Sequence, residues 1–282
     1  MTQRPELAAD TRQASAGELA AAPHATALGI GEILPLLISP DSGRALAQER
    51  GGKALSDGEN LYPQRGEPYL LLPGRLQQYF TDRLKVPLAE YADDAFMQYF
   101  LLASIKQSGE INAAADDVHY ERHLHRLRAL LAGAEGLVLD VGCDDPEIGA
   151  SLLPPAVRYV GLDPFCSRET PFRLIGVGEY LPFKDASLDG VLFNTSLDHI
   201  LDWRRALDEA RRVLVPGGRL YLCTLAWTER AGLLADSVHF HHFREYEIFG
   251  ALEGMGIEEV RRYDYKGNDH RHGLYLAARK PV

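Results

Sequence analysis

From residue 136 onward, short apolar runs alternate with segments in which apolar residues recur every three or four positions. The runs predict strands at 137–141, 157–162, 172–175, 190–194 and 219–225. The periodic segments predict helices at 146–153, 203–214 and about 243–254. Two further strands, 257–265 and 274–279, follow one another at the end of the chain. This alternation predicts an α/β fold with a mainly parallel sheet and an antiparallel hairpin at its edge.

The N-terminal half has a different pattern. Residues 1–29 are rich in Ala and polar residues, which predicts a mobile tail, with a short helix at 14–22 as the alternative. Residues 30–73 carry short apolar runs between turn-forming clusters, which predicts a small β-rich domain. Residues 74–118 show helical spacing and predict a helical cap, and the α/β domain then spans 119–282. About 45 residues build a poor core alone, so the β-rich unit is expected to pack on its neighbour or to need a staple.

The composition of the chain bears on which partners it can bind and on the cellular compartment in which it is expected. The 282 residues include 30 basic and 40 acidic side chains, for a net charge of −10, which disfavours nucleic acid or an anionic membrane as the main partner. Three cysteines cannot form a disulfide framework, and no apolar run is long enough to span a membrane. The N-terminus lacks the apolar core of a signal peptide. We therefore expect a cytoplasmic protein without membrane insertion.

Two acids stand at the ends of adjacent predicted strands. The first strand ends in Asp140, and Gly142 and a helix beginning near Pro146 follow. Twenty-three residues after Asp140, the second strand ends in Asp163. Ligands of open α/β sheets bind at the carboxyl ends of the strands, and an acid at the second strand can accept both hydroxyls of a ribose. The pair indicates a nucleoside site.

These segments resemble the class I S-adenosylmethionine (SAM)-dependent methyltransferases, over about 136–280. Asp140 and Gly142 match the first motif, Asp163 matches the ribose acid, and Gly176–Phe183 resembles the adenine-side segment. Leu197–Asp202 resembles a segment after the fourth strand, and Leu214-Val215-Pro216-Gly217-Gly218 matches the turn before the fifth strand. The resemblance implies a doubly wound, seven-stranded, Rossmann-like methyltransferase fold that binds SAM.

The resemblance also implies roles for individual residues. The residues it places at the cofactor are Asp140, Gly142 and Asp144 near the methionine part, Asp163 at the ribose, Gly178 and Glu179 beside the adenine, and Asn194 and Thr195 below the sulfonium, with Cys143 and Pro164 as further cofactor-binding residues. Cys143 is commonly a packing residue at this position. Three positions depart from the family. Asp144 and Pro146 replace glycines, and Val177 replaces the acid that holds the adenine amine. A catalytically inactive or repurposed binding or scaffold subunit is therefore the alternative to an enzyme.

Histidines supply the candidate catalytic groups. His199 follows the fourth strand and is the first candidate base, with Asp198 as the rival base and a packing or capping role as the alternative. His239 and His241 form a possible metal pair, but a loop in which one histidine touches substrate is favoured, so no metal site is expected. His119, His123 and His125 predict a solvated helix face or a lid for an acidic acceptor.

A second, weaker resemblance covers residues 33–73. They resemble a zinc-ribbon-like domain found in a tRNA-methyltransferase activator and ahead of some methyltransferases, with Tyr62–Leu71 keeping its tail. Ser39 and Ser42 stand where its first cysteine pair would be, and no thiolate remains. This implies a degenerate ribbon held by packing, without zinc.

The sequence as a whole predicts SAM-dependent methylation of a small molecule or glycan, at oxygen in preference to nitrogen or carbon. A nicotinamide-dependent oxidoreductase is disfavoured, because G-x-G-x-x-G is absent after the first strand. A homodimer or a partner protein is compatible with the sequence.

Overall fold

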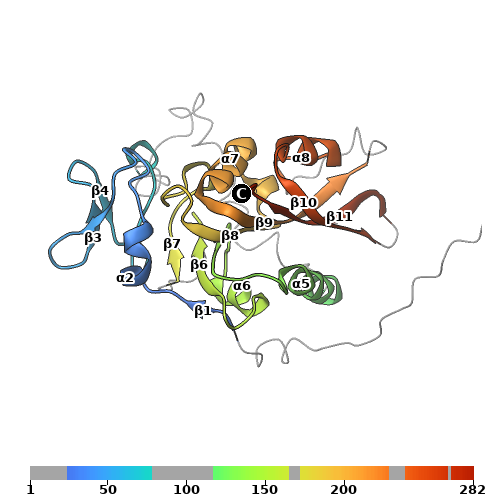
Figure 1. Ribbon diagram of the computed structural model, residues 1–282, viewed down its shortest axis with the longest axis horizontal. Helices are drawn as coiled ribbons and strands as arrows, with labels where there is room; N and C mark the ends of the chain where they lie inside the picture. Colours follow the sequence, from blue (N-terminus) through green and yellow to red (C-terminus); the bar gives the residue numbers. More distant parts are fainter. Residues whose placement is uncertain (1–23, 78–116, 165–171, 229–238, 266–267) are drawn as a thin grey trace, which may run out of the picture.

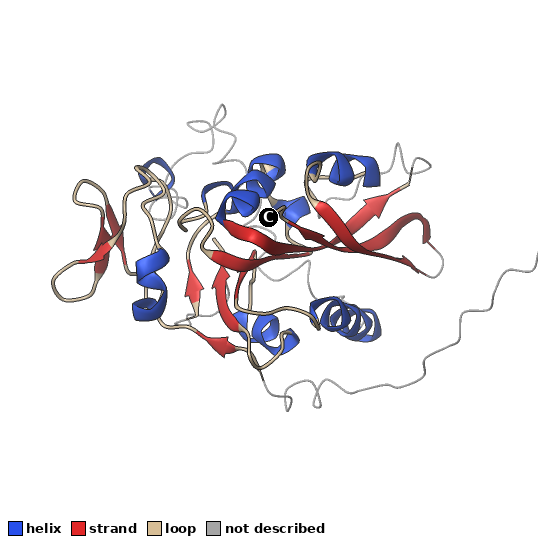
Figure 2. Ribbon diagram, in the orientation of Figure 1, coloured by secondary structure: helices blue, strands red, loops and turns tan. Residues whose placement is uncertain are grey.

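A central sheet with helices on both faces forms the body of the protein (Figures 1 and 2). The computed structural model describes residues 24–77, 117–164, 172–228, 239–265 and 268–282, so most of the predicted tail and helical cap lies outside the described residues. The eight strands run in the order β1-β6-β5-β8-β9-β11-β10, with β7 also paired to β6. Their bounds are β1 Thr26–Ala27, β5 Leu137–Val141, β6 Arg158–Leu162, β7 Arg173–Leu174, β8 Leu188–Asn194, β9 Leu214–Trp227, β10 Gly256–Tyr265 and β11 Asn268–Arg279.

The helices divide between the two faces of the sheet. Those on one face are α5 (Asp117–Leu131) and α6 (Pro146–Leu152), and those on the other are α7 (Trp203–Val213) and α8 (Glu245–Ala251) (Figure 1). Strand β5 shows why two cores result. Leu137, Leu139 and Val141 join the apolar cluster of α7 and α8, while Val138, between the first two, joins the cluster of α5 and α6.

The predicted doubly wound, mainly parallel sheet is confirmed. Strands β1, β5, β6, β7, β8 and β9 pair in parallel, and β11 pairs antiparallel with both β9 and β10. The final strand begins six residues earlier than the apolar run at 274 suggested, because its polar start at 268–273 continues the hairpin ladder. Among the described residues, no helix is long and apolar enough to cross a membrane.

The N-terminal boundary differs from the prediction. Residues 24–29 were assigned to the mobile tail, but Thr26 and Ala27 form β1 and pair with Arg158 and Tyr159 of β6. Leu28 beside them is buried. Strand β7 pairs only with Gly161 and Leu162, so the outer edge of β6 is open at its beginning and accepts β1 there. The expected seven strands therefore become eight.

The β-rich unit shares its core with the α/β domain. It consists of the short helices α2 (Ile30–Ile33) and η1 (Leu34–Leu36) and a three-stranded antiparallel sheet of β2 (Ala47–Gln48), β3 (Ala54–Ser56) and β4 (Leu61–Pro63). Leu37 bridges to Phe183 and Leu70 to Ile175 across the junction. Leu55, Tyr62 and Leu71 are fully buried in the same apolar cluster as β5 and α7. The unit is thus stabilised by its neighbour, as its small size predicts.

Hydrogen bonds occupy the part of this unit that was compared with a metal ribbon. The buried hydroxyl of Tyr62 donates to Asp41 Oδ2 and accepts from Ser39 Oγ, both at 2.7 Å. Asp41 also accepts the backbone N–H of Gly74. Burial raises the pKa of Tyr62, so the phenol stays a donor. The resemblance of 33–73 to a ribbon-like domain itself stays a prediction.

We predict that the two units unfold together. Leu71→Ala removes a fully buried side chain from the shared core and is expected to lower the free energy of unfolding by about 2–4 kcal/mol. Leu61→Ala, in the same unit but 55% exposed, is the matched control and is expected to change it little. Both are measured by chemical denaturation with fluorescence and circular dichroism. Two separate transitions in the Leu71→Ala protein would contradict a shared core.

Candidate functional site

A buried carboxylate lies at the end of β5. Asp140 is 1% exposed, and its Oδ2 accepts a hydrogen bond from the Tyr159 hydroxyl at 2.9 Å. Its Oδ1 is buried and has no hydrogen-bond partner among the described residues. Burial, with a further contribution from the charge of Asp163, raises the pKa of Asp140 to about 7, although the bond from Tyr159 acts in the opposite direction. An acceptor atom in this state is suited to a cationic ligand.

The turn after Asp140 keeps the backbone path of a glycine-rich turn despite its altered sequence. Gly142 has φ 78°, and a Cβ there would lie 2.4 Å from Ser196 Cβ, so glycine is required. Asp144 has φ 44°, in the left-handed region that Asp tolerates better than most residues. Asp145 then accepts the N–H of Glu147 and caps α6, whose first residue is Pro146. The two departures from glycine are therefore accommodated by local backbone chemistry.

The second strand-end acid is fixed by this turn. The backbone N–H of Asp144 donates to Asp163 Oδ2 at 3.0 Å, and Asp163 is 7% exposed. Pro164 follows it directly and is partly buried. Gly161 of β6 lies opposite Asp140 in the parallel ladder, so the ends of the two strands are adjacent. The structure thus brings Asp140, Asp144 and Asp163 together, as the sequence predicted.

Three other residues predicted at the cofactor have clear packing contacts. Burial, together with the charge of Asp163, raises the pKa of the Cys143 thiol well above its usual range, so the sulfur is protonated. A Cβ on Gly178 would lie 2.9 Å from Ile200 Cδ1, so this glycine lets two segments approach closely. Glu179 is buried, and its carboxylate accepts the N–H of Asp202, the N-cap of α7. Burial raises the pKa of Glu179 to about 6. Contacts of Gly178 and Glu179 with adenine stay predictions.

The end of β8 is held by a histidine that the sequence analysis assigned elsewhere. Asn194 Oδ1 accepts from His123 Nε2 at 2.9 Å, and His123 Nδ1 accepts from the Tyr275 hydroxyl at 2.7 Å. The sequence predicted a solvated helix face or a lid for an acidic acceptor. The solvated face is wrong for His123, which lies one turn before the buried Leu127 on the inner side of α5. Burial lowers its pKa, so the imidazole is neutral. Thr195, with φ 51°, donates its N–H to the carbonyl of Cys223.

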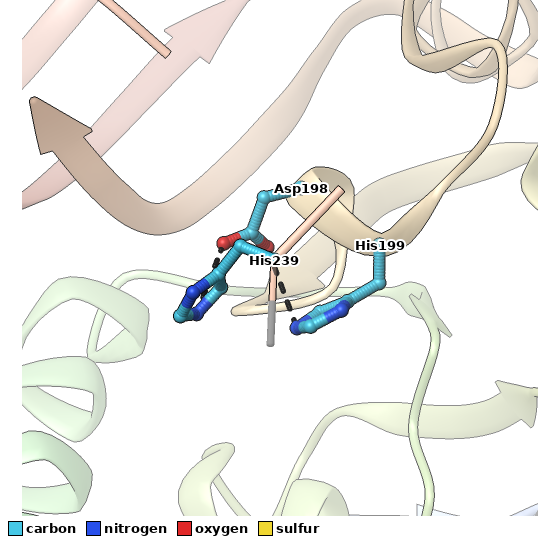
Figure 3. Close-up of side chains that lie close together, drawn as sticks. All are labelled: Asp198, His199 and His239. Carbon is cyan, nitrogen blue, oxygen red and sulfur yellow. Dashed lines mark ion pairs between the residues drawn. The ribbon is translucent and has the colours of Figure 1, made fainter. Parts of the chain in front are cut away.

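The candidate catalytic residues form a cluster with a third residue. Asp198 and His199 lie on η5 (Leu197–His199), and Asp198 Oδ1 is 4.0 Å from His199 Nε2. Asp198 Oδ2 is 3.6 Å from His239 Nε2 (Figure 3). The cluster is assembled by the backbone, because the N–H groups of Phe240 and His241 both donate to the Asp198 carbonyl. Asp198 is buried, and the two imidazoles are partly exposed.

The cluster corrects the histidine pairing considered from the sequence. His241 Nε2 lies 2.8 Å from the carbonyl of Ile200, so its ring packs on the chain after η5 and is separated in role from His239. His239 instead meets Asp198 and His199, whose ligand atoms all lie within 4.8 Å of one another. About forty residues separate His239 from Asp198, and no local spacing could reveal this contact.

A second residue missed from the sequence lies beside the strand-end acids. Arg173 of β7 is buried and interacts electrostatically with Asp163 and Asp144. Burial lowers the pKa of its guanidinium, and the charge of Asp163 acts against that shift. A single Arg within a short apolar run is the signal that could have marked it. The site therefore contains an internal cation as well as its acids.

Comparison with known proteins identifies the domain that carries this site. Residues 139–222 match the family described as "Methyltransferase domain". An uncharacterized methyltransferase of Mycobacterium bovis is 34% identical over 115 residues, which are 38% of this chain and 47% of that protein. The ubiquinone/menaquinone biosynthesis C-methyltransferase of Geobacter sulfurreducens is 28% identical over 136 residues, 42% of this chain and 52% of that protein. The chain spans about half the length of the curated relatives it matches.

A solved structure extends the likeness over more of the chain. The 1,6-didemethyltoxoflavin-N1-methyltransferase of Burkholderia thailandensis gives a TM-score of 0.51 at 20% identity, covering 70% of this chain and 92% of that one. At this identity the likeness concerns the fold. The comparisons confirm the expected Rossmann-like methyltransferase fold, and residues 139–222 are the part that matches a methyltransferase domain.

We predict that His123 stabilises the end of β8. His123→Ala removes its hydrogen bonds with Asn194 and Tyr275 and is expected to cost about 1–3 kcal/mol of folding stability at pH 8. Because the pKa of His123 is lowered in the folded state, wild-type stability is expected to fall as the pH drops below about 6.5, and this decline should be shallower in the variant. His125→Ala, at an exposed position of the same helix, is the control for denaturation curves across this pH range. Equal pH profiles in wild type and His123→Ala would contradict the assignment.

Proposed function

We propose that this protein transfers the methyl group of SAM to an oxygen atom of a small molecule. The observation that carries the proposal is the meeting of Asp140 and Asp163 at neighbouring strand ends, around a turn whose backbone conformation requires Gly142. The matches to a methyltransferase domain and to two methyltransferases support the activity.

The residues of this site fit SAM chemically. SAM carries a sulfonium and an ammonium, and the buried Asp140 offers an oxygen that accepts no hydrogen bond among the described residues. We propose that Asp140, Gly142 and Asp144 hold the methionine part, and that Asp163, oriented by the N–H of Asp144, accepts from the ribose hydroxyls. Val177 cannot accept from the adenine amine, so adenine would be held by shape and backbone groups there.

Bound SAM supplies a methyl group that is displaced in line from its sulfur. The chain must bring the acceptor oxygen into line and accommodate its proton. We assign this place to the cluster of Asp198, His199 and His239. In the protein without a bound cation, the neutral imidazole of His199 takes the proton, and the carboxylate of Asp198 stabilises the imidazolium. The O–H bond breaks, an O–CH₃ bond forms, and the S–CH₃ bond breaks.

A small aromatic or enolic hydroxyl compound is the acceptor class we favour over a glycan. One relative is named as a quinone C-methyltransferase, and a structural neighbour was solved with bound 1,6-didemethyltoxoflavin and S-adenosylhomocysteine. A deprotonated hydroxyl on a conjugated ring presents electron density at oxygen and at the adjacent carbon. Mass spectrometry with fragmentation of the product distinguishes O- from C-methylation.

The second candidate function is a methyltransferase-like binding or scaffold subunit. Asp144, Pro146 and Val177 favour it, because each replaces a residue that family members use at the cofactor. Calorimetric titration of the full chain with SAM and S-adenosylhomocysteine separates the two. Micromolar binding supports the enzyme, and the absence of binding at millimolar ligand supports the subunit.

We predict that Asp163 contributes directly to SAM affinity. Asp163→Asn keeps an oxygen for the N–H of Asp144 but removes the negative charge, so the Kd for SAM is expected to rise about 10- to 100-fold. Asp208→Asn, on an exposed face of α7, is the control for a lost charge elsewhere in the domain. Calorimetry of both variants, with unfolding curves to verify the fold, gives the answer. An unchanged Kd in Asp163→Asn would remove Asp163 from the cofactor site.

We also predict that SAM binds more weakly in acid. The pKa of Asp140 in the free protein is raised to about 7, and a cationic ligand favours its ionised form. Binding at pH 6 must therefore release a proton, and the Kd is expected to be up to about tenfold higher than at pH 8. Asp140→Asn should abolish most of this difference, whereas titration of Asp163 or other neighbours would leave it. Equal wild-type affinity at both pH values would show that Asp140 stays neutral or lies apart from the ligand charge.

A further inference from the structure

The cluster of Asp198, His199 and His239 has the composition of a metal site. It offers one carboxylate and two imidazoles, and the three ligand atoms all lie within 4.8 Å of one another. Dashed lines in Figure 3 join the Asp198 carboxylate to both rings. Two histidines with one carboxylate form the ligand set of the facial triad that holds divalent iron and related ions.

The distances leave room for an ion between the three side chains. The separations of 3.6 Å (Asp198 to His239) and 4.0 Å (Asp198 to His199) exceed the usual hydrogen-bond range of about 2.7–3.2 Å. Ligand atoms about 2.1 Å from one cation lie about 3.0 Å apart when adjacent and about 4.2 Å apart when opposite. The two separations, which run to different oxygens of Asp198, are longer than the adjacent spacing. The side chains would therefore draw together by about 1 Å to bind one first-row divalent cation in a facial arrangement.

The three side chains are held by backbone hydrogen bonds, and the cluster is buried at the carboxylate and partly exposed at the imidazoles. Asp198 is 3% exposed, and its backbone carbonyl accepts the N–H groups of Phe240 and His241, which locks the segment of His239 onto η5. The imidazoles of His199 and His239 are 33% and 17% exposed. The acid therefore lies inside and the imidazoles lie toward solvent, so the remaining coordination positions face outward, where a ligand can enter.

We propose that Asp198, His199 and His239 bind a divalent first-row transition-metal ion, and that the methyl acceptor is a small molecule that chelates this ion through two adjacent oxygens. The second part rests on the proposed function and deepens it. Three protein ligands leave up to three positions of an octahedral ion, which suit an ortho-dihydroxy or hydroxy-carbonyl group.

A bound ion would replace His199 as the group that promotes deprotonation of the acceptor hydroxyl, at the same cluster of side chains. With an ion bound, the two imidazoles act as ligands, and the metal lowers the pKa of the coordinated hydroxyl. The O–H bond breaks and its proton passes to solvent water. The oxygen then forms the O–CH₃ bond as the S–CH₃ bond of SAM breaks. No oxidant or reductant is needed.

The first experiment measures metal binding by the full chain. We expect the purified, chelator-treated protein to bind one equivalent of Zn²⁺ in calorimetry, and Co²⁺ to give visible d–d absorption with nitrogen and oxygen ligands. His239→Ala should weaken both by at least tenfold, while His125→Ala, an exposed histidine on α5, should leave them unchanged. Absence of stoichiometric Zn²⁺ binding at 1 mM, or equal binding by wild type and His239→Ala, would overturn the site.

Two further readouts separate this inference from the proposed function. SAM affinity is measured on the same samples, because His239 takes no part in the proposed SAM contacts. SAM binding without metal binding would overturn the metal site and the chelating acceptor but leave the methyl transfer. Metal binding without SAM binding would overturn the methyl transfer and the acceptor assignment but leave the metal site. Catechol is expected to shift the Co²⁺ spectrum of the wild type and phenol to leave it unchanged. No shift with catechol would overturn the chelating acceptor.

Discussion

The cost of burying like charges side by side governs this structure. Asp140 and Asp163 stand at the ends of two adjacent strands, both are nearly inaccessible to water, and the charge of Asp163 disfavours ionisation of Asp140. The protein offsets part of this cost with the Tyr159 hydroxyl, the N–H of Asp144 and the buried Arg173. The part of the cost that is not offset is seen in the raised pKa of Asp140. A folded protein that retains such a cost is arranged to receive a compensating positive charge, which is the physical basis of the proposed cofactor site.

The α/β part of the fold was predictable because its signals are local. Strand ends and the cap at Asp145 are each encoded within a few residues, so β5 to β8, β10, α6 and α7 lie close to their predicted bounds. Strands β9 and β11 begin five and six residues before their predicted starts at 219 and 274. The proximity of Asp140 and Asp163 could also be predicted from the sequence, because parallel strands place their carboxyl ends at one edge of the sheet. Pairing at the edge of the sheet was less predictable. Strand β1 consists of Thr26 and Ala27 alone, and two residues are too few to show a strand pattern of hydrophobic and polar positions.

Long-range side-chain contacts lay beyond sequence reasoning. His239 reaches Asp198 because two backbone N–H groups donate to one carbonyl. His123 reaches Asn194 because α5 packs against β9 and β11, next to the end of β8. Glu179 differs in the opposite way. Its motif predicted a place beside the cofactor, and the structure shows its carboxylate accepting the N–H of Asp202 at the start of α7. In each case the residue type was informative, and its partner was determined by tertiary packing. The roles of these residues in binding and catalysis remain predictions of the proposed function.

Two N-terminal segments, β1 and residues 69–71, cover part of the outer edge of the central sheet. Strand β1 covers the beginning of the outer edge of β6, and Tyr69 and Leu71 exchange backbone hydrogen bonds with Ile175 just beyond β7. An uncovered sheet edge is a template onto which a strand of another molecule can add. These two short segments therefore occupy edge positions to which a strand of another molecule would otherwise have access. A chain lacking residues 24–73 would leave both positions open to intermolecular strand addition.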